Sequence, residues 1–156
     1  MSSSDLPQIV IHHSPQFDLR FACLKAERRR PTGRVEYHFE GKCRLRHPSG
    51  PFDYTAADLN MDPDSFARLA QDLRAIQQGT RDDPVLKALP EMFELRLERS
   101  SSKLKADLKI REYIAPHVAT LTAIFDVDYD LFVNKLLGEI EKFVGELRRV
   151  EPDEVS

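Results

Sequence analysis

The chain has 156 residues, with 41% hydrophobic and 31% charged side chains and a net charge of −3. This balance is typical of one globular domain with a core and excludes a disordered chain, and the negative charge argues against a dedicated nucleic-acid binder. No apolar run approaches the roughly 20 residues of a membrane span, and the opening MSSSDLPQ lacks the pattern of a signal peptide. We therefore expect a cytoplasmic protein with a single domain over residues 1–156 and flexible tails at 1–7 and 151–156.

The first sixty residues predict strands. IVIHH is the expected first strand, and PFDYTAADLNM is expected to be extended. Between them, FDLRFACLK and RVEYHFEGKCRLRH alternate apolar and polar side chains and predict an antiparallel hairpin, in which Gly41 marks a bulge or bend. Cys23 and Cys43 fall on its inner face, and the pattern leaves open whether they lie near each other or ever pair. Two cysteines are too few for a disulfide scaffold and indicate buried thiols in a reducing cytosol.

The segment MDPDSFARLAQDLRAIQQG predicts the first helix. Asp62 is the expected N-cap, Pro63 the first helical residue, and Asp64 an acidic group that complements the helix dipole. Gly79 is expected to end the helix. The apolar residues at helical spacing are Phe66, Leu69, Ala70, Leu73 and Ile76.

The second half predicts a hairpin from FELRLER and KLKADLKIR, a strand from TLTAIFDVD, and a long helix that ends near Val150. The apolar positions of that helix are Phe132, Val133, Leu136, Leu137, Ile140, Phe143, Val144 and Leu147. This stripe is wider than a surface helix requires, so either the helix lies deep over the sheet or part of it meets a second subunit in a homodimer. The predicted class is α+β: an antiparallel sheet of about six strands with two main helices packed on one face.

The segment IFDVDYDLF carries the strongest candidate site, because Asp126, Asp128 and Asp130 alternate with other residues. A calcium loop of the EF-hand type needs glycine at its sixth position and glutamate at its twelfth. Counted from Asp126, those positions hold Leu131 and Leu137, so the calcium interpretation fails. A metal site that uses Asp126 or Asp128 together with histidines stays the alternative, and it would make the protein a metal-dependent enzyme.

A structural role explains the same aspartates. The strand pattern puts Asp126 and Asp128 on the solvent side, and Asp128 is then placed to cap the helix that follows. NMDPDSF, ahead of the first helix, has the same order of an apolar residue, Asp, any residue, and Asp. We therefore expect Asp126, Asp128 and Asp130 to form an exposed acidic contact for a partner, and we assign no catalytic, metal or cofactor residue.

Two further candidates have weaker support. His12 and His13 are adjacent and point to opposite faces of a strand, so they cannot bind one metal together. RRRPTGR and KCRLRH make a basic hairpin, but Tyr37 and Phe39 fall on its apolar face and are not interleaved with the cations. A nucleic-acid binder that uses this hairpin is thus an alternative to a protein binder.

The order of three segments resembles a known family. LNMDPDSFARLAQDLRAIQQG gives a strand end and a helix, MFELRLERSSSKLKADLKI gives a hairpin, and LTAIFDVDYDLFVNKLLGEIEKFVGEL gives a strand, an acidic junction and a terminal helix. Over about residues 52–149 this layout is similar to the WapI-type immunity proteins, small cytosolic antagonists of contact-delivered bacterial toxins, and to allied bacterial domains of unknown function. The resemblance implies a non-catalytic protein whose partner is a toxin domain, and it supplies no catalytic residue.

Overall fold

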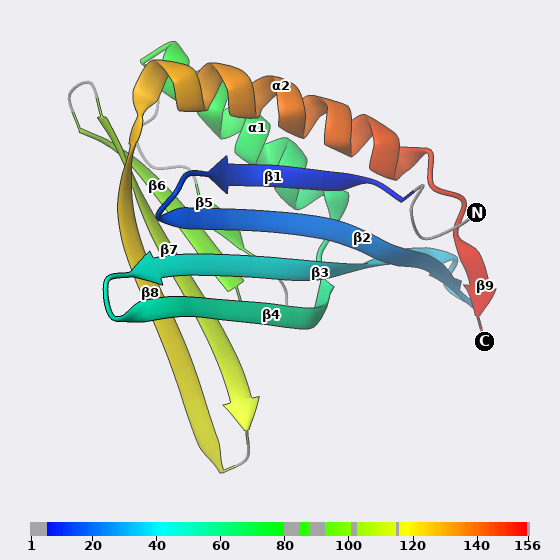
Figure 1. The fold of residues 1–156 in the computed structure, drawn as a ribbon. Helices are drawn as coiled ribbons and strands as arrows, with labels where there is room; N and C mark the ends of the chain where they lie inside the picture. Colours follow the sequence, from blue (N-terminus) through cyan, green and yellow to red (C-terminus); the bar gives the residue numbers. More distant parts are fainter. Residues whose placement is uncertain (1–5, 80–84, 88–92, 101–102, 115, 156) are drawn as a thin grey trace. The chain divides into compact units, whose positions relative to one another are not determined.

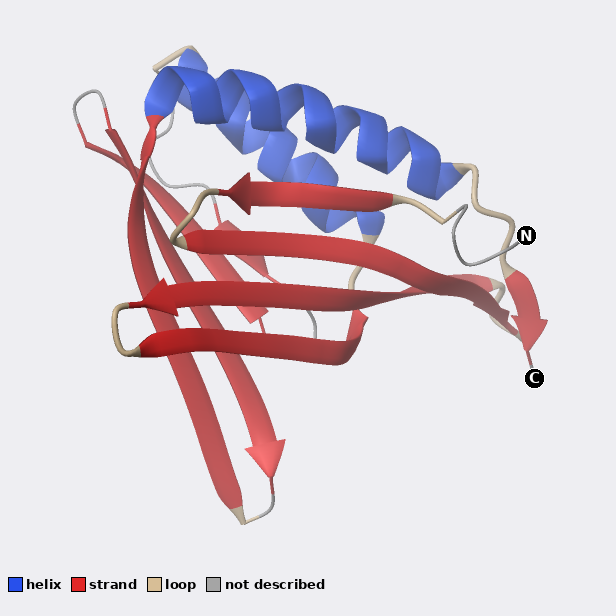
Figure 2. Ribbon diagram, viewed as in Figure 1, coloured by secondary structure: helices blue, strands red, loops and turns tan. Residues whose placement is uncertain are grey.

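The computed structural model describes residues 6–79, 85–87, 93–100, 103–114 and 116–155 (Figure 1). Within them the chain forms two helices and otherwise mostly strands (Figure 2), so the predicted α+β class is confirmed. The chain divides into two compact units. Unit 1 comprises Met1–Pro63 and Lys142–Ser156, and unit 2 comprises Asp64–Glu141. No helix in the described part of the chain has both the length and the apolar character needed to cross a membrane.

Unit 1 is built on a five-stranded sheet, sheet A. Its strands are β1 (Gln8–His13), β2 (Phe17–Arg29), β3 (Arg34–His47), β4 (Gly50–Asn60) and β9 (Asp153–Val155). The first four follow one another as an antiparallel meander, whereas β9 pairs with β2 in parallel. The alternation of apolar and polar residues in β2 and β3 is the reason for this layout, since it gives each strand one face for the core.

Unit 2 holds sheet B and the first helix. The elements are α1 (Pro63–Gln77), β5 (Val85–Lys87), β6 (Phe93–Ser100), β7 (Lys103–Ile114) and β8 (His117–Asp128). Sheet B is antiparallel in the order β5-β6-β7-β8. The sequence predicted one sheet of about six strands, and the structure instead has two sheets. The reason is that every strand pairing except that of β2 with β9 joins neighbours in sequence, and α1 separates the two meanders.

Both helices begin where the capping residues predict. Helix α1 begins at Pro63, directly after Asp62, and Asp64 lies in its first turn. Gly79 follows the end of α1 with a φ of +75°, a conformation that glycine adopts without strain. Helix α2 (Tyr129–Arg148) begins directly after Asp128 and carries Asp130 in its first turn.

Helix α2 passes from unit 2 into unit 1 and supplies apolar side chains to both. Seven of its predicted apolar positions are buried: Val133, Leu136, Leu137, Ile140, Phe143, Val144 and Leu147. The side chain of Phe132 lies outside the described residues. In unit 2, side-chain contacts join α1 to α2 through Gln77 with Asn134 and Arg74 with Glu141. The wide stripe thus packs within one chain, because the helix serves two cores, and it leaves no apolar face of α2 for a second subunit among the described residues.

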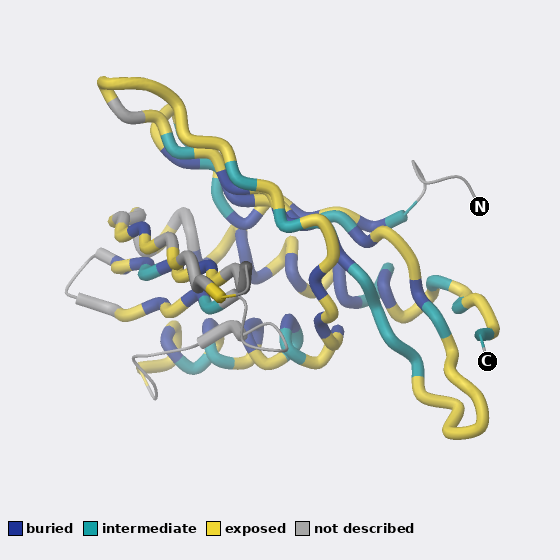
Figure 3. The backbone as a smooth tube through the Cα atoms, turned by 90° about the horizontal axis from the view of Figure 1, so that it is seen from below, coloured by how far each residue is buried: buried dark blue, intermediate teal, exposed yellow. Residues whose placement is uncertain are grey.

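The core of unit 1 lies on one face of sheet A, where the rings of Phe39 and Phe143 are 6.1 Å apart. The buried side chains there include Ile9, Ile11, Phe17, Leu19, Phe21, Cys23, Cys43 and Leu59. In unit 2, the buried strand residues are Leu95, Leu97, Leu104, Ala106, Leu108, Ile110 and Ala123. These match the predicted inner faces, as the alternating colours along the strands show (Figure 3). The side chains of Phe93, Leu121, Phe125 and Val127 lie outside the described residues.

The last residues of the chain differ from the prediction of a flexible tail at 151–156. Residues Asp153–Val155 form β9 and pair with Glu27–Arg29 of β2. A pair of ion contacts explains the attachment, because Glu154 lies 3.2 Å from Arg28 and 3.5 Å from Arg30. At the other end of the chain, Pro7 is buried, and residues 1–5 lie outside the described part.

Candidate functional site

The outer face of sheet A carries a layer of charged side chains, and we call it the charged face. It is defined by Asp18, Arg20, Glu40, Lys42, Arg44 and Asp53, from strands β2, β3 and β4. These residues alternate in sequence with the buried core residues of the same strands, so the pleat points them away from the core.

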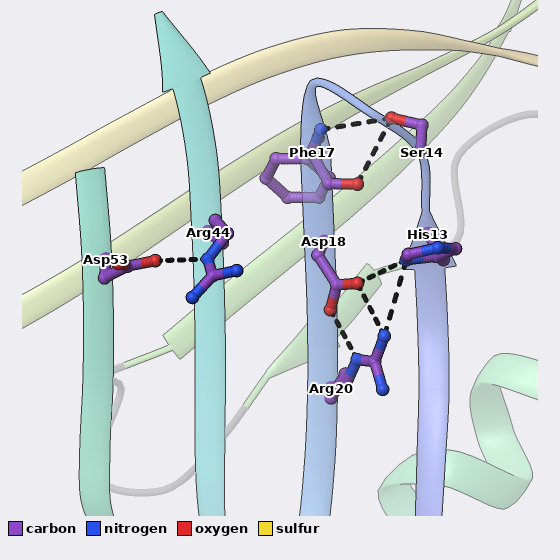
Figure 4. Close-up of polar contacts among 7 residues, drawn as sticks. All are labelled: His13, Ser14, Phe17, Asp18, Arg20, Arg44 and Asp53. Carbon is purple, nitrogen blue, oxygen red and sulfur yellow. Dashed lines mark hydrogen bonds and ion pairs between the residues drawn. The ribbon is translucent and has the colours of Figure 1, made fainter. Parts of the chain in front are cut away.

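Asp18 is the centre of a hydrogen-bonded cluster on the charged face (Figure 4). The Arg20 guanidinium donates from Nε to Asp18 Oδ1 at 2.6 Å and from Nη2 to Oδ2 at 2.8 Å. His13 Nδ1 lies 2.5 Å from Asp18 Oδ2. The hydrogen bond from Arg20, helped by the one from His13, holds the pKa of Asp18 below its usual value, although partial burial opposes this shift. The cluster therefore keeps a negative charge fixed on the sheet surface.

The turn between β1 and β2 positions this cluster. The Ser14 hydroxyl accepts a hydrogen bond from the Phe17 N–H at 3.0 Å and donates to the Phe17 carbonyl at 3.2 Å. The Ser14 N–H donates to the same carbonyl at 2.8 Å. The closed turn brings His13 opposite Asp18 in the strand register.

The register extends the cluster into a row across four strands. His13 is opposite Asp18, Asp18 is opposite Arg44, and Arg44 is opposite Asp53. The Arg44 Nε lies 2.6 Å from Asp53 Oδ1 (Figure 4). Hydrogen-bond donors thus alternate with carboxylates along the row, and within it the Arg44 cation lies between two carboxylates, an arrangement in which cross-strand neighbours attract each other.

A hollow of about 570 Å³ lies beside this row. Its lining includes all six residues of the charged face together with Gln8, Ala22, Tyr54 and Thr55. Ala22 is opposite Gln8 on one side and Glu40 on the other, so a short side chain lies between two longer ones. The hollow combines three cationic and three carboxylate groups, a lining suited to polar, charged groups of a partner.

A second cluster of charges surrounds His38 in strand β3. His38 Nδ1 lies 2.8 Å from Asp58 Oδ1, and its Nε2 is buried and lies 3.8 Å from Glu27 Oε2. Glu27 also pairs with Lys25 at 2.8 Å, and this hydrogen bond lowers the pKa of Glu27. These contacts hold the charged side chains in place at the end of β2 nearer the hairpin tip.

The predicted acidic contact lies in unit 2. Asp126 and Asp128 are exposed at the end of β8, and Asp130 is exposed in the first turn of α2. Asp126 is directly opposite Lys105 in the register, and Asp128 is opposite Lys103. All three aspartates are thus exposed, and the register puts a lysine opposite two of them. The role of these residues in partner binding stays a prediction.

The histidines do not form a shared cluster among the described side chains. His12 is half-buried with its ring 5.7 Å from that of Phe17, and burial lowers its pKa. His13 and His38 each contact carboxylates on separate parts of sheet A. The side chains of His47 and His117 lie outside the described residues. Within the described part of the chain, no group of three or more potential metal ligands comes together.

The two cysteines are both buried and free. Cys23 is opposite Phe39, whereas Cys43 is opposite Leu19, four residues before Cys23 on the same strand. Four residues of strand span roughly 13 Å, well beyond the reach of a disulfide. Burial raises the pKa of each thiol to about 11. The cysteines are therefore core residues, and neither is a reactive nucleophile at neutral pH.

At the tip of the basic hairpin, between β2 and β3, the arginine side chains contact acidic side chains. Arg29 Nε lies 2.8 Å from Glu36 Oε2, and Arg28 and Arg30 contact Glu154. The Phe39 ring is fully buried, which removes it as a stacking surface for bases. Nucleic-acid binding by this hairpin has no support beyond its charge.

Sequence reasoning missed the charged face as a unit. FDLRFACLK and RVEYHFEGKCRLRH contain its residues at outward positions, so the alternation was the available signal. The missing information was the register, which decides that Arg44 faces both Asp18 and Asp53. Comparison of this chain with protein families, with curated proteins and with solved structures finds no match.

Proposed function

We propose that this chain is a protein-binding domain without chemistry of its own and that it binds its partner through the charged face of sheet A. The observation that carries the proposal is the cross-strand row from His13 to Asp53, in which the charges of Asp18, Arg44 and Asp53 alternate in sign. A patterned charged surface selects partners by charge complementarity and accelerates their encounter.

The geometry of the ion pairs favours recognition over catalysis. The guanidinium of Arg44 in the row and that of Arg20 next to it are each held by a carboxylate at hydrogen-bonding distance, from Asp53 and Asp18. Side chains that are already ordered lose less conformational entropy when a partner binds. Both arginine side chains are at least half exposed, so their charges reach solvent and a partner.

The resemblance to WapI-type immunity proteins supports a bacterial toxin domain as the partner and the cytoplasm as the place of action. An immunity protein of this kind works by covering or distorting its toxin, and it requires no catalytic group. The excess of acidic over basic side chains in residues 51–156, 21 against 14, lies mostly outside the charged face, and it can steer a toxin with a basic surface toward the chain.

The proposal is tested with any toxin domain that a neighbouring gene encodes, by measuring binding and the protection of cells that express the toxin. The decisive variant exchanges one ion pair, Arg44→Asp with Asp53→Arg, which keeps that pair, reverses the local field and places a second carboxylate opposite Asp18. Circular dichroism checks that the variant is folded. We expect this exchange to weaken binding by about tenfold or more and to reduce protection.

The matched control exchanges a pair in unit 2, Arg74→Glu with Glu141→Arg, which also joins two exposed side chains. This control is expected to bind like the unchanged protein. Equal binding by both exchanged variants would remove the charged face from the interface. Failure of the unchanged protein to bind or protect would refute the immunity function itself.

The predicted acidic contact is a second candidate surface for the same partner. Asp126→Asn with Asp130→Asn removes two exposed carboxylates and leaves Asp128 at the start of α2. A loss of binding in this variant, without a loss in the Arg44/Asp53 exchange, would assign the interface to unit 2.

A further inference from the structure

Strand β8 forms an open edge of sheet B. It is the last strand in the order β5-β6-β7-β8, and no other described strand pairs with its free side. Its register with β7 runs without a shift from Lys103 opposite Asp128 to Ile114 opposite His117. The strand contains no proline. A long regular edge of this kind is a template for pairing with another strand.

The edge strands of sheet A have register shifts, whereas β8 has none and contains no proline, although Pro116 directly precedes it. Strand β1 lies between Pro7 and Pro15 and contains an irregularity between Val10 and His12. Strand β4 begins next to Pro51, and its pairing with β3 shifts between Phe39 and Gly41. Prolines and bulges are devices that stop edge strands from pairing with other chains.

The outer side of β8 has a composition suited to pairing with itself. The described side chains on that side are Thr120, Thr122, Ile124, Asp126 and Asp128, and all of them are exposed. Ile124 is 60% exposed, the highest value among the exposed large hydrophobic side chains of the described residues. It lies at the middle of this series, with threonines on one side and aspartates on the other.

We propose that β8 pairs antiparallel with β8 of a second copy of this chain, with the twofold axis at Ile124. In this register Ile124 is opposite Ile124 of the copy, Thr122 is opposite Asp126, and Thr120 is opposite Asp128. Each threonine hydroxyl then has a carboxylate directly across the new interface, and two exposed isoleucines cover each other. The two sheets B become one continuous sheet.

Charge selects this register against those in which the axis is shifted toward Asp128. A twofold axis at Asp126 would place Asp126 opposite its own copy, and an axis between Asp126 and Asp128 would place those two carboxylates opposite each other. Like charges directly opposite destabilise strand pairing. An axis between Ile124 and Asp126 would put the isoleucine opposite a carboxylate. The axis at Ile124 avoids all three arrangements and follows the symmetry rule that twofold interfaces bring a residue onto itself.

This dimer uses a different surface from the homodimer suggested by the sequence, in which the wide apolar stripe of α2 would meet a second subunit. The described apolar residues of α2 are buried within one chain, so the helix provides no surface for a copy. The edge of β8 provides main-chain donors and acceptors, and such groups give strand addition its affinity.

The first test measures the mass of the full chain over a concentration series by sedimentation or light scattering. The unchanged protein is expected to dimerise. Ile124→Lys places two cations opposite each other on the axis and should raise the dimer dissociation constant by about tenfold or more. Leu24→Lys, at a 41% exposed position on β2 of unit 1, is the control and should dimerise like the unchanged protein.

The second test determines the register by cysteine cross-linking under mild oxidation. Ile124→Cys should form a disulfide with its copy, because directly opposite Cβ atoms lie about 4.5–5.5 Å apart. Thr122→Cys alone should not, since its copies are four residues apart in the register, roughly 13 Å along the strand. A mixture of Thr122→Cys and Asp126→Cys should form the mixed disulfide. Cys23 and Cys43 are buried and should not compete.

Circular dichroism confirms that each variant is folded, so a loss of dimer is read as a loss of the interface. A protein that is monomeric throughout the series overturns the proposal, even if a strand of another protein binds to β8. A dimer that Ile124→Lys leaves intact, or efficient cross-linking of Thr122→Cys with itself, also overturns it.

Discussion

The two sheets of this protein differ in regularity. Sheet A has a register shift in each of its three antiparallel pairs, between Val10 and His12, between Cys23 and Lys25, and between Phe39 and Gly41. The described pairs of sheet B run without a shift. Bulges increase strand twist and redirect side chains. Sheet A carries a hollow lined by charged side chains. The strands of sheet B pair regularly, and one side of its last strand, β8, pairs with no other described strand.

This difference suggests two ways in which a sheet serves recognition. In the two proposals above, the irregular sheet would meet its partner through the side chains of one face, and the regular sheet would pair with a copy through its main chain. The predictions below test the comparison through stability and reactivity.

The largest effect is expected from the removal of a core side chain in either sheet. Phe39→Ala removes a fully buried ring of sheet A that packs against Phe143, and it should lower the free energy of unfolding by about 3–5 kcal/mol. Leu108→Ala, at a fully buried position of sheet B, should lower it by about 2–5 kcal/mol. Denaturant unfolding followed by circular dichroism measures both values.

The same pair of variants tests the single-domain prediction. Helix α2 is continuous through both units and contributes buried residues to each, such as Ile140 and Phe143. One domain predicts a single calorimetric transition that both variants shift to lower temperature. Two transitions, each shifted by only one variant, would mean that the sheets unfold independently.

A smaller effect is expected at the bulge of sheet A. A Cβ atom at Gly41 would lie 3.0 Å from Leu59 Cδ1 and 3.1 Å from Phe21 Cε1, so Gly41→Ala should destabilise the protein by about 1–3 kcal/mol. Gly138→Ala is the matched change in helix α2, where nothing lies within 4 Å of the added atom. It should stabilise the protein by about 0.5–1 kcal/mol. Equal effects of the two substitutions would show that the close approach at Gly41 is unimportant.

The thiols of sheet A should be unreactive in the folded protein. Their pKa of about 11 is above the ordinary value of 9.0, because burial disfavours the thiolate. Ellman's reagent at a pH of about 8 should modify Cys23 and Cys43 only after denaturation. The raised pKa also means that this contribution to stability is complete below pH 9.0 and decreases as the pH rises toward 11. Rapid modification of the native protein at neutral pH would contradict the burial.

The smallest effect is expected on the charged face. Asp18→Asn removes the carboxylate that pairs with Arg20 and His13, and it should lower the free energy of unfolding by less than about 1 kcal/mol at neutral pH. The pKa of Asp18 is lowered in the folded state, so its contribution is present above the ordinary value of 3.8 and is lost as the pH falls through the folded pKa. The difference between the two proteins should therefore disappear in acid. Glu139→Gln, an exposed change on α2, is the control.

The elements of the fold could be predicted largely from the sequence. Alternation located β2, β3, β6 and β7, and the capping residues Asp62 and Gly79 located the ends of α1. These signals are local, and each reflects the chemistry of a few neighbouring residues. Gly41 lies at an irregularity, as its place on the inner face predicted, and the extra residue is on β4, where Ala56 and Leu59 pair with Gly41 and Phe39.

The relations between distant segments could not be predicted in the same way. Strand pairing beyond sequence neighbours depends on the whole chain, so the division into two sheets and the parallel pairing of β9 with β2 left no local signal. The separation of Cys23 from Cys43 depends on register, which a pattern of period two does not determine. The same reason hid the charged face, since Asp18 and Arg44 are neighbours only in the correct register.

The discontinuity of unit 1 has a consequence for biosynthesis. Residues 1–63 leave the ribosome long before residues 142–156, whereas unit 2 is one uninterrupted stretch. During translation the nascent chain can complete unit 2 while sheet A still lacks β9 and the end of helix α2. Until then, the part of β2 that later pairs with β9 is available to other strands. Strand β2 is thus synthesised well before its last native neighbour, β9.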